Sequence, residues 1–84
     1  MVKIYSTSWC APCAAAKALL KSKGISFTEV DIEEQGMTRN DLADLTGGAT
    51  VPQIIINDKC IGGYDNLMKL NQSGELDRMI EDAK

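Results

Sequence analysis

The sequence predicts an α/β fold in which helices flank a small mixed β-sheet. Short apolar or β-branched runs alternate with helix-forming segments along the chain, in the order βαβ-α-ββα. In residues 2–32 a helix separates two strands, and a crossover of that length makes the strands parallel neighbours joined right-handedly. In residues 53–61 two strands share a two-residue turn, which makes them antiparallel. Parallel and antiparallel pairs together predict an α/β sandwich with a mixed sheet.

Residues 2–32 predict the first two strands and the helix between them. The run 2–5, Val-Lys-Ile-Tyr, is short and β-prone and predicts a central strand. Ala, Leu and Lys, which favour helices, dominate residues 10–23, and Gly24 is a natural stop just past the helix end. Residues 25–32 predict the second strand. The side chains expected in the core are Ala15, Leu19 and Leu20 from the helix, and Phe27, Val30 and Ile32 from the second strand.

The rest of the chain predicts a helix, a hairpin and a last helical region. Thr38, followed three residues later by Asp41, has the spacing of a capped helix start. Leu42 and Leu45 follow at helical spacing, and Gly47 ends that helix. The remaining elements are expected as strands 53–56 and 59–61 joined by a turn at 57–58, a helix opening at Asp65, and a last helical turn through residues 76–80 after a break at 71–74.

Length and composition exclude several classes of protein. The chain has 84 residues, 44% of them apolar and 25% charged, so it is too apolar for a disordered segment and has room for one domain, residues 1–84. A net charge of −3 argues against a nucleic-acid partner. No apolar run approaches the ~20 residues that span a bilayer, and no charged start leads into an apolar signal segment. We therefore expect a soluble, cytoplasmic monomer with neither a membrane nor a nucleic-acid partner.

Two residue counts narrow the chemistry. The chain has no His, which excludes an imidazole base, a His-assisted nucleophile and a His metal ligand. The three Cys, at positions 10, 13 and 60, are too few for a four-Cys zinc site or a disulfide-stapled secreted protein. The close pair, Cys10 and Cys13, points to redox chemistry. Cys60 is expected to be a half-buried structural thiol, with regulatory oxidation as the alternative.

Cys10 and Cys13 fall where the first strand meets the first helix. Three-residue spacing puts both sulfurs on one face of the opening helical turn, close enough to bridge. Free backbone N–H groups and the helix dipole favour a thiolate at Cys10, whereas Cys13, one turn deeper, should be more buried. Half of a zinc site or two unrelated buried cysteines are the alternatives, but the position at a helix start favours redox work.

The segment before the third strand has two interpretations. Pro52 either marks the start of an edge strand, where the absence of an N–H costs no hydrogen bond of the sheet, or is the second residue of a cis peptide. In the second case the turn aims the Val51 backbone N–H and C=O outward, ready to pair with an extended substrate near Cys10.

The glycines before the third helix also have two interpretations. Gly62 and Gly63 are either a flexible turn or allow a ligand to approach the backbone closely, with the helix N-terminus offering N–H groups to a carboxylate. In the second case Asp65 accepts from a cationic amine, so a ligand that carries both groups suits the site.

Three motifs together resemble a glutaredoxin: the Cys10-x-x-Cys13 pair, the Thr50-Val51-Pro52-Gln53 segment about 40 residues later, and the Ile61-Gly-Gly-Tyr-Asp65 segment beyond it. The resemblance covers nearly the whole chain. It implies the thioredoxin fold, with strands in the order 2-1-3-4 and the hairpin antiparallel to the first two. It also implies glutathione as the reductant and co-substrate, with no tightly bound cofactor and no metal.

The resemblance also implies roles for individual residues. Cys10 corresponds to the nucleophile and Cys13 to the resolving thiol, and the two form a redox-active disulfide. Val51 resembles the backbone clamp for the glutathione cysteine. The residues implied to bind glutathione are Thr50, Val51, Pro52 (in a cis peptide), Gly63, Tyr64 and Asp65, the last two at the γ-glutamyl end, with Arg39 as a candidate cation.

The chain departs from the family pattern at two cationic positions. Family members often have a Lys or Arg three residues before the nucleophile, where this chain has Thr7, and many have a basic residue just before Thr-Val-Pro, where it has Ala49. Both departures remove cations that partner the thiolate or a glutathione carboxylate. Arg39 and Lys17 remain as candidate cations, and the alternative for each is a solvated helix residue.

The function that the resemblance implies is glutathione-dependent reduction of protein disulfides and glutathione mixed disulfides. Disulfide-containing proteins are the expected clients, and ribonucleotide reductase is a habitual client of such small redoxins. Dithiol glutaredoxins commonly carry Cys-Pro-Tyr-Cys, whereas Trp9 and the Ala11-Pro12 pair resemble thioredoxin's Trp-Cys-Gly-Pro-Cys. A thioredoxin-like electron donor reduced by a flavoprotein reductase is therefore the alternative. A third candidate, a module that bridges an iron–sulfur cluster through Cys10 and glutathione, is disfavoured by the adjacent proline and by Cys13.

Overall fold

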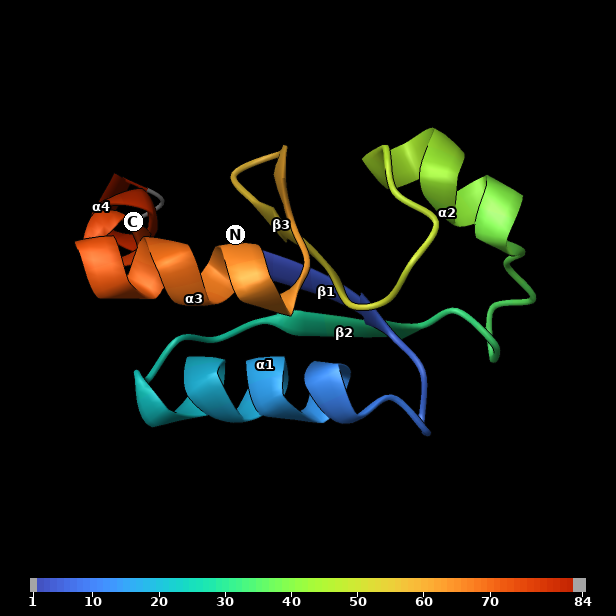
Figure 1. Cartoon of the computed structure of the whole chain (residues 1–84), viewed down its shortest axis with the longest axis horizontal. Helices are drawn as coiled ribbons and strands as arrows, with labels where there is room; N and C mark the ends of the chain where they lie inside the picture. Colours follow the sequence, from blue (N-terminus) through green and yellow to red (C-terminus); the bar gives the residue numbers. More distant parts are fainter. Residues whose placement is uncertain (1, 83–84) are drawn as a thin grey trace.

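The computed structural model describes residues 2–82 and follows the predicted element order (Figure 1). The strands are β1 (Val2–Ser6), β2 (Thr28–Asp31), β3 (Gln53–Ile56) and β4 (Lys59–Gly62); the helices are α1 (Ala11–Ser22), α2 (Arg39–Thr46), α3 (Tyr64–Ser73) and α4 (Glu75–Asp82). The longest of these helices, α1, has 12 residues. No helix within residues 2–82 is long and apolar enough to cross a membrane.

The strands form one mixed sheet in the order β2-β1-β3-β4. β1 pairs in parallel with β2 and antiparallel with β3, and β3 pairs antiparallel with β4. Asn57 and Asp58, with φ of 54° and 67°, form the two-residue hairpin turn that the twist of paired strands favours. The predicted strand order, the central position of β1 and the hairpin are confirmed.

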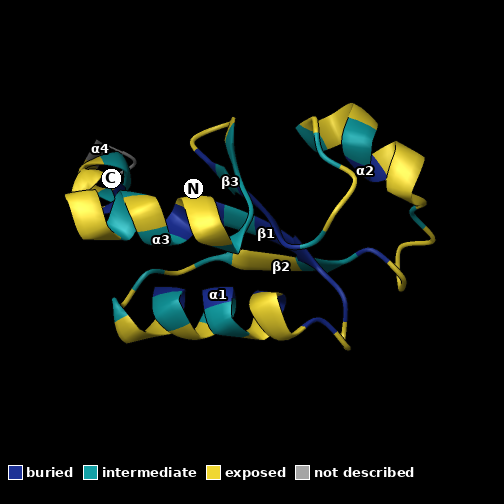
Figure 2. Cartoon of the chain, viewed as in Figure 1, coloured by how far each residue is buried: buried dark blue, intermediate teal, exposed yellow. Residues whose placement is uncertain are grey.

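Helices cover both faces of the sheet. Residues from α1, α3 and α4 share one apolar core with β1 and β3, while α2 packs on the opposite face. Successive side chains of a strand point to opposite faces, so Ile4 and Ile54 enter the first core and Tyr5 and Ile55 the second. Figure 2 shows the same division along α1, whose buried side faces the sheet and whose outer side is exposed.

Two element boundaries differ from the prediction. β2 begins at Thr28 rather than at residue 25, because the Ile25 N–H donates to the Leu20 carbonyl (2.9 Å) and thereby belongs to the end of α1. The expected break at 71–74 is shorter, because residues 71–73 belong to α3, which ends at Gly74 with φ of 84°. The expected last helical turn is a separate eight-residue helix, α4.

The buried faces of the helices also differ in detail. In α1 the fully buried residues besides Leu20 are Cys13 and Ala16, at positions i and i+3 of one face, whereas the expected core residue Ala15 is only partly buried. In α2 Leu42 is fully buried, but Leu45, at helical spacing from it, is 61% exposed.

Candidate active site

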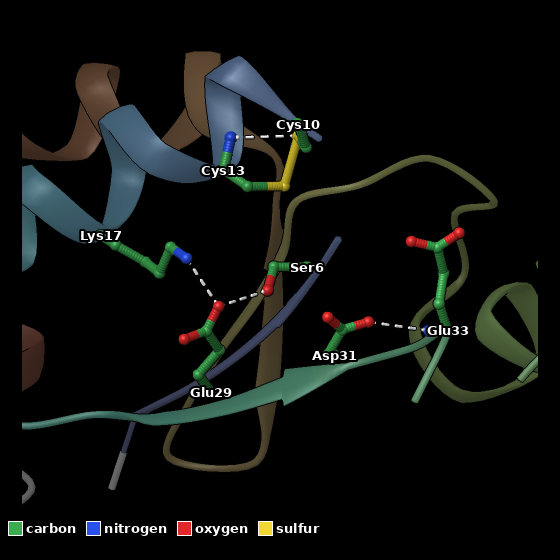
Figure 3. Close-up of polar contacts among 7 residues, drawn as sticks. All are labelled: Ser6, Cys10, Cys13, Lys17, Glu29, Asp31 and Glu33. Carbon is green, nitrogen blue, oxygen red and sulfur yellow. Dashed lines mark hydrogen bonds and ion pairs between the residues drawn. A yellow bond between two sulfur atoms is a disulfide. The ribbon is translucent and has the colours of Figure 1, made fainter. Parts of the chain in front are cut away.

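Cys10 and Cys13 form a disulfide at the N-terminus of α1, with Cα atoms 5.2 Å apart (Figure 3). Cys10 is the N-cap of the helix, and its Sγ accepts the Cys13 backbone N–H at 3.1 Å. Cys10 is 8% exposed, while Cys13 is fully buried. Pro12 lies in the first turn of α1. Backbone N–H groups in a first turn have no helical hydrogen-bond partner, so the absence of an N–H in proline costs no hydrogen bond there. An incoming thiolate therefore reaches the sulfur of Cys10 before that of Cys13.

The loop that leads into β3 lies directly against this disulfide. The Val51–Pro52 peptide bond is cis, as the resemblance to a glutaredoxin implies. The Cys10 Sγ lies 3.7 Å from the Val51 carbonyl oxygen. The Gln53 side-chain amide donates to the Thr50 carbonyl oxygen at 2.8 Å and so stabilises the conformation of the loop. A backbone segment with polar groups thus flanks the accessible sulfur.

A cavity of about 390 Å³, which we call the Asp65 cavity, extends from this loop to the start of α3. Gly63 is the N-cap of α3 and provides no side-chain cap, so the first N–H groups of the helix are available to an anion. The start of α3 and the loop before β3 lie close together, because a Cβ built at Gly63 would be 3.4 Å from the Pro52 carbonyl oxygen. The cavity is lined by Pro12, Thr50, Val51, Pro52, Gly63, Tyr64, Asp65 and Asn66.

A second cavity of about 360 Å³, the Cys10 cavity, opens over the disulfide. Arg39, the first residue of α2, lines the Cys10 cavity. A capping box fixes the start of this helix: Thr38 Oγ1 accepts the Asp41 N–H, and the Asp41 carboxylate accepts the Thr38 N–H. The site therefore has a carboxylate, that of Asp65, in one cavity and a guanidinium, that of Arg39, in the other. The Cys10 cavity is lined by Trp9, Cys10, Ala11, Pro12, Arg39, Thr50 and Val51.

The structure brings the sequence-predicted site residues to one end of the sheet. Cys10 lines the Cys10 cavity, and Cys13 is fully buried. The residues implied to bind glutathione each line one or both cavities: Arg39, Thr50, Val51, Pro52, Gly63, Tyr64 and Asp65. Sequence reasoning gave no binding role to Trp9, which borders the Cys10 cavity, or to Asn66, which borders the Asp65 cavity. One indication of a role for each residue was present in the sequence: Trp9 directly precedes the Cys10-x-x-Cys13 pair, and Asn66 directly follows Asp65.

Lys17, the other candidate cation, is engaged elsewhere. Its Nζ forms an ion pair with Glu29 Oε2 at 2.6 Å, and the Ser6 hydroxyl donates to the same oxygen at 2.8 Å (Figure 3). The hydrogen bond from Lys17, helped by that from Ser6, lowers the pKa of Glu29 from its ordinary value of 4.5. Lys17 lines neither cavity at the disulfide, whereas Arg39 lines the Cys10 cavity.

The arrangement suits thiol–disulfide exchange. One sulfur is reachable, its partner is buried one helical turn away, and the N–H of Cys13 is positioned to stabilise negative charge on Cys10 Sγ. Within residues 2–82 no group of three or more His, Cys, Asp or Glu side chains is placed to hold a metal ion.

Comparison with known proteins identifies the family. The Glutaredoxin family model matches residues 2–61. A glutaredoxin from Pseudomonas aeruginosa is 42% identical over 79 residues, which cover 94% of this chain and 94% of that protein. The chain belongs to the glutaredoxin family. Glutaredoxin 3 from Escherichia coli is likewise 42% identical, over 95% of this chain and 96% of its own length.

Solved glutaredoxin structures share the fold. The crystal structure of a buckwheat glutaredoxin–glutathione complex superposes with a TM-score of 0.88 at 26% identity, and covers 96% of this chain and 76% of that one. The sheet order and this likeness establish the thioredoxin fold of the glutaredoxins. The family and its dithiol pair make this chain a thiol–disulfide oxidoreductase.

Proposed function

We propose that the protein is a glutathione-dependent oxidoreductase that reduces protein disulfides and glutathione mixed disulfides through Cys10 and Cys13. The observation that carries the proposal is the arrangement of charge on either side of the reachable sulfur. Asp65 and the free N–H groups of α3 lie on one side, and Arg39 lies on the other. Glutathione has a zwitterionic γ-glutamyl group at one end, a thiol in the middle and a glycine carboxylate at the other end. The order of these groups matches the order of the complementary groups around Cys10.

Each end of glutathione has a complementary group in this arrangement. The cysteine of glutathione pairs with the Val51 backbone, so that its sulfur meets Cys10 Sγ. The α-carboxylate of the γ-glutamyl residue accepts from the first N–H groups of α3, and its ammonium group donates to Asp65. The glycine carboxylate pairs with Arg39. The buckwheat relative, whose structure is described as a glutathione complex, supports the same ligand here.

The reaction proceeds by two exchanges on the client. The Cys10 thiolate attacks one sulfur of a client disulfide, forming a Cys10–client disulfide and releasing the other client sulfur as a thiolate. Cys13, as a thiolate, then attacks Cys10 Sγ, which releases the second client thiol and forms the Cys10–Cys13 disulfide. The two enzyme sulfurs give the client two electrons, and the two released client thiolates take up protons from water and from the ionisation of Cys13.

Two glutathione molecules return the enzyme to the dithiol. The first attacks Cys10 Sγ, the more exposed sulfur, and releases Cys13. The second attacks the glutathione sulfur of this mixed disulfide, releasing oxidised glutathione and the Cys10 thiolate. A client that is itself a glutathione mixed disulfide enters directly at the Cys10–glutathione stage and does not need Cys13.

The test is turnover of a glutathionylated peptide with two alternative reductants. In one assay the electrons come from NADPH through glutathione reductase and glutathione; in the other, from NADPH through thioredoxin reductase alone. We expect NADPH consumption to saturate with peptide and to require glutathione. Turnover with thioredoxin reductase and none with glutathione would replace this function with that of a thioredoxin-like electron donor, which the exposed Trp9 beside Cys10 favours.

A further inference from the structure

A groove at the edge of the sheet, which we call the β4 groove, contains neither active-site cysteine nor the loop before β3. Its volume is about 380 Å³, close to that of the Asp65 cavity. β4 is the outer strand of the sheet that residues 2–82 form, and three consecutive residues of it, 59–61, line the groove. Successive side chains of a strand point to opposite faces, so the groove follows the edge of β4 rather than one face. Residues of α3 and α4, which pack against each other, line the rest of it.

The β4 groove continues the Asp65 cavity along α3. Asn66 lines both, and Lys69 and Leu70, which line the groove but not the Asp65 cavity, follow Asn66 at helical spacing. The four-residue step from Asp65 to Lys69 is a rise of about 6 Å, roughly the length of two residues of extended chain. A chain that leaves the Asp65 cavity along α3 therefore enters the groove within about two residues.

The groove holds two ammonium groups that form no ion pair. Lys59 and Lys69 are exposed, and neither is paired with an acidic residue that the structure describes. Glu75, the first residue of α4, is the carboxylate of the lining, so two positive charges and one negative charge leave the groove with one net positive charge. The whole chain has a net charge of −3. The groove is therefore a locally basic surface on an acidic protein, and it favours an acidic partner.

The remaining lining suits an extended peptide. Ile61, Leu70 and Met79 line the groove, and each packs against the larger apolar core while staying partly exposed. They offer contact to the aliphatic parts of a bound chain. As the outer strand, β4 also presents a backbone edge to which an extended segment can add.

We propose that the β4 groove binds an acidic segment of a protein client, on the N-terminal side of the client half-cystine. The direction rests on the proposed function, in which the γ-glutamyl group that precedes the cysteine of glutathione lies at the Asp65 cavity. A client chain in the same orientation runs from Cys10 through the Asp65 cavity into the groove. Carboxylates at the third and fourth residues before the half-cystine then meet Lys59 and Lys69. Glutathione ends at its γ-glutamyl group, so it does not reach the groove.

The experiment attaches a peptide to Cys10 and reads the groove through Cys60. In Cys13→Ser, the Cys10 thiolate attacks a peptide whose one Cys carries a thionitrobenzoate group; coloured thionitrobenzoate leaves, and the peptide remains as a Cys10–peptide disulfide. One equivalent of peptide is used, and peptide mapping confirms attachment at Cys10. Cys60 lines the groove, has no part in the proposed ion pairs and is then the remaining free thiol. Its rate of alkylation by uncharged iodoacetamide reports whether the groove is covered.

Four peptides test the charge and the direction. Three carry Glu-Glu, Gln-Gln or Lys-Lys at the third and fourth positions before the Cys, and the fourth carries Glu-Glu at the corresponding positions after it. We expect the first peptide to slow Cys60 alkylation about fivefold relative to the other three, the effect of two exposed ion pairs. In about 1 M sodium chloride, where the Debye length is about 3 Å, most of this difference should disappear.

Substitutions in the groove should move the difference in opposite directions. The double variant Lys59→Gln/Lys69→Gln should bring the alkylation rates of the Glu-Glu and Gln-Gln complexes to the same value. Glu75→Gln, which removes the carboxylate of the lining, should increase the difference between them. The matched control is Lys21→Gln, on α1 and outside the groove, which should leave the difference unchanged.

Three results would overturn the inference. Equal alkylation of the Glu-Glu and Gln-Gln complexes would mean that the groove does not bind the acidic segment, and equal protection by Glu-Glu on either side of the Cys would indicate a general electrostatic effect. Protection that rises with protein concentration in the absence of peptide would assign the groove to a second copy of the chain.

A second measurement covers the case in which Cys60 resists alkylation in every complex. Thionitrobenzoate release must then be faster from the peptide with Glu-Glu before the Cys than from the Gln-Gln peptide, and the double lysine variant must abolish that difference; otherwise the inference is wrong. No glutathione enters these reactions, so their failure is distinct from a failure of the assay with glutathione reductase.

Discussion

The Sγ atom of Cys10 lies 3.7 Å from the carbonyl oxygen of Val51, although 41 positions separate the two residues. The sheet accounts for this proximity. β3 runs antiparallel to β1, and the pairing of Tyr5 with Gln53 sets the end of β1 beside the start of β3. The loop before β3 therefore meets the helix that follows β1. The redox sulfur and the backbone that borders it are brought together by strand register.

The difference in exposure between the two active-site sulfurs predicts which one alkylates first. In fully reduced protein with Cys60→Ser, we expect iodoacetamide to label Cys10 well before Cys13 at neutral pH. Cys10 is the more exposed, and the Cys13 N–H stabilises negative charge on its sulfur. Peptide mapping by mass spectrometry over a time course measures both rates. Faster labelling of Cys13 would reverse the assigned roles.

The position of Asp65 predicts a specific effect on glutathione binding. Asp65→Asn keeps the size of the side chain but removes the charge proposed to accept from the γ-glutamyl ammonium. We expect the KM for glutathione to rise roughly tenfold, the value of one charged hydrogen bond, with a much smaller change in kcat. Asp44→Asn, on α2 and outside both the Asp65 cavity and the Cys10 cavity, is the matched control. Equal KM values in the two variants would remove Asp65 from the binding site.

The Glu29 carboxylate predicts a pH-dependent contribution to stability. Its pKa is lowered from 4.5 in the folded protein, chiefly by the hydrogen bond from Lys17, so the ionised form is the one that folding stabilises. This stabilisation is present at pH values above the pKa of Glu29 in the unfolded chain, and it is lost as the pH falls through the pKa of Glu29 in the folded protein. Because the side chain is 42% exposed, solvent screening keeps the effect below about 1 kcal/mol.

Urea unfolding of Glu29→Gln at two pH values checks this contribution. We expect a lower free energy of unfolding than in the wild type at pH 7 and a smaller difference at pH 3. Glu34→Gln, which changes an exposed carboxylate three residues beyond the end of β2, is the control. A difference between wild type and Glu29→Gln that grows toward low pH would contradict the assignment.

The fold was largely predictable because its signals are local. The β-branched run before Asn57 and Asp58, the Thr38–Asp41 box and the Cys pair at a helix start each depend on a few adjacent residues. Strand order came from the family resemblance instead, because pairing between β1 and β3 is a long-range property.

The parts of the site that escaped prediction depend on tertiary contacts. The Trp9–Glu33 hydrogen bond joins residues 24 positions apart, and no local pattern indicates it. Thr7 is 3% exposed, and its Oγ1 has no hydrogen-bond partner among the residues that the structure describes, which no local pattern indicates. In the sequence Thr7 was notable solely as a departure from a family pattern. Lys17 was considered as a cation for the site because its pairing with Glu29 across 12 positions has no local signal either.

The two cysteines should be separable by reaction type. A glutathione mixed disulfide needs one nucleophile, because a second glutathione releases the product. A protein disulfide benefits from an intramolecular thiol, whose effective concentration far exceeds that of any free thiol. Cys10→Ser should therefore abolish both reactions, since the remaining sulfur of Cys13 is fully buried.

Cys13→Ser should retain reduction of glutathione mixed disulfides, and even accelerate it, because the competing internal disulfide no longer forms. The same variant should lose most of its activity on a protein disulfide. Insulin reduction and the glutathionylated-peptide assay measure the two activities in parallel, and Cys60→Ser, which alters a thiol outside the disulfide, is the matched control. Should Cys13→Ser be inactive on glutathione mixed disulfides, Cys13 would be required in every cycle. The dithiol exchange of a thioredoxin-like donor would then describe the protein better than the glutathione-dependent mechanism.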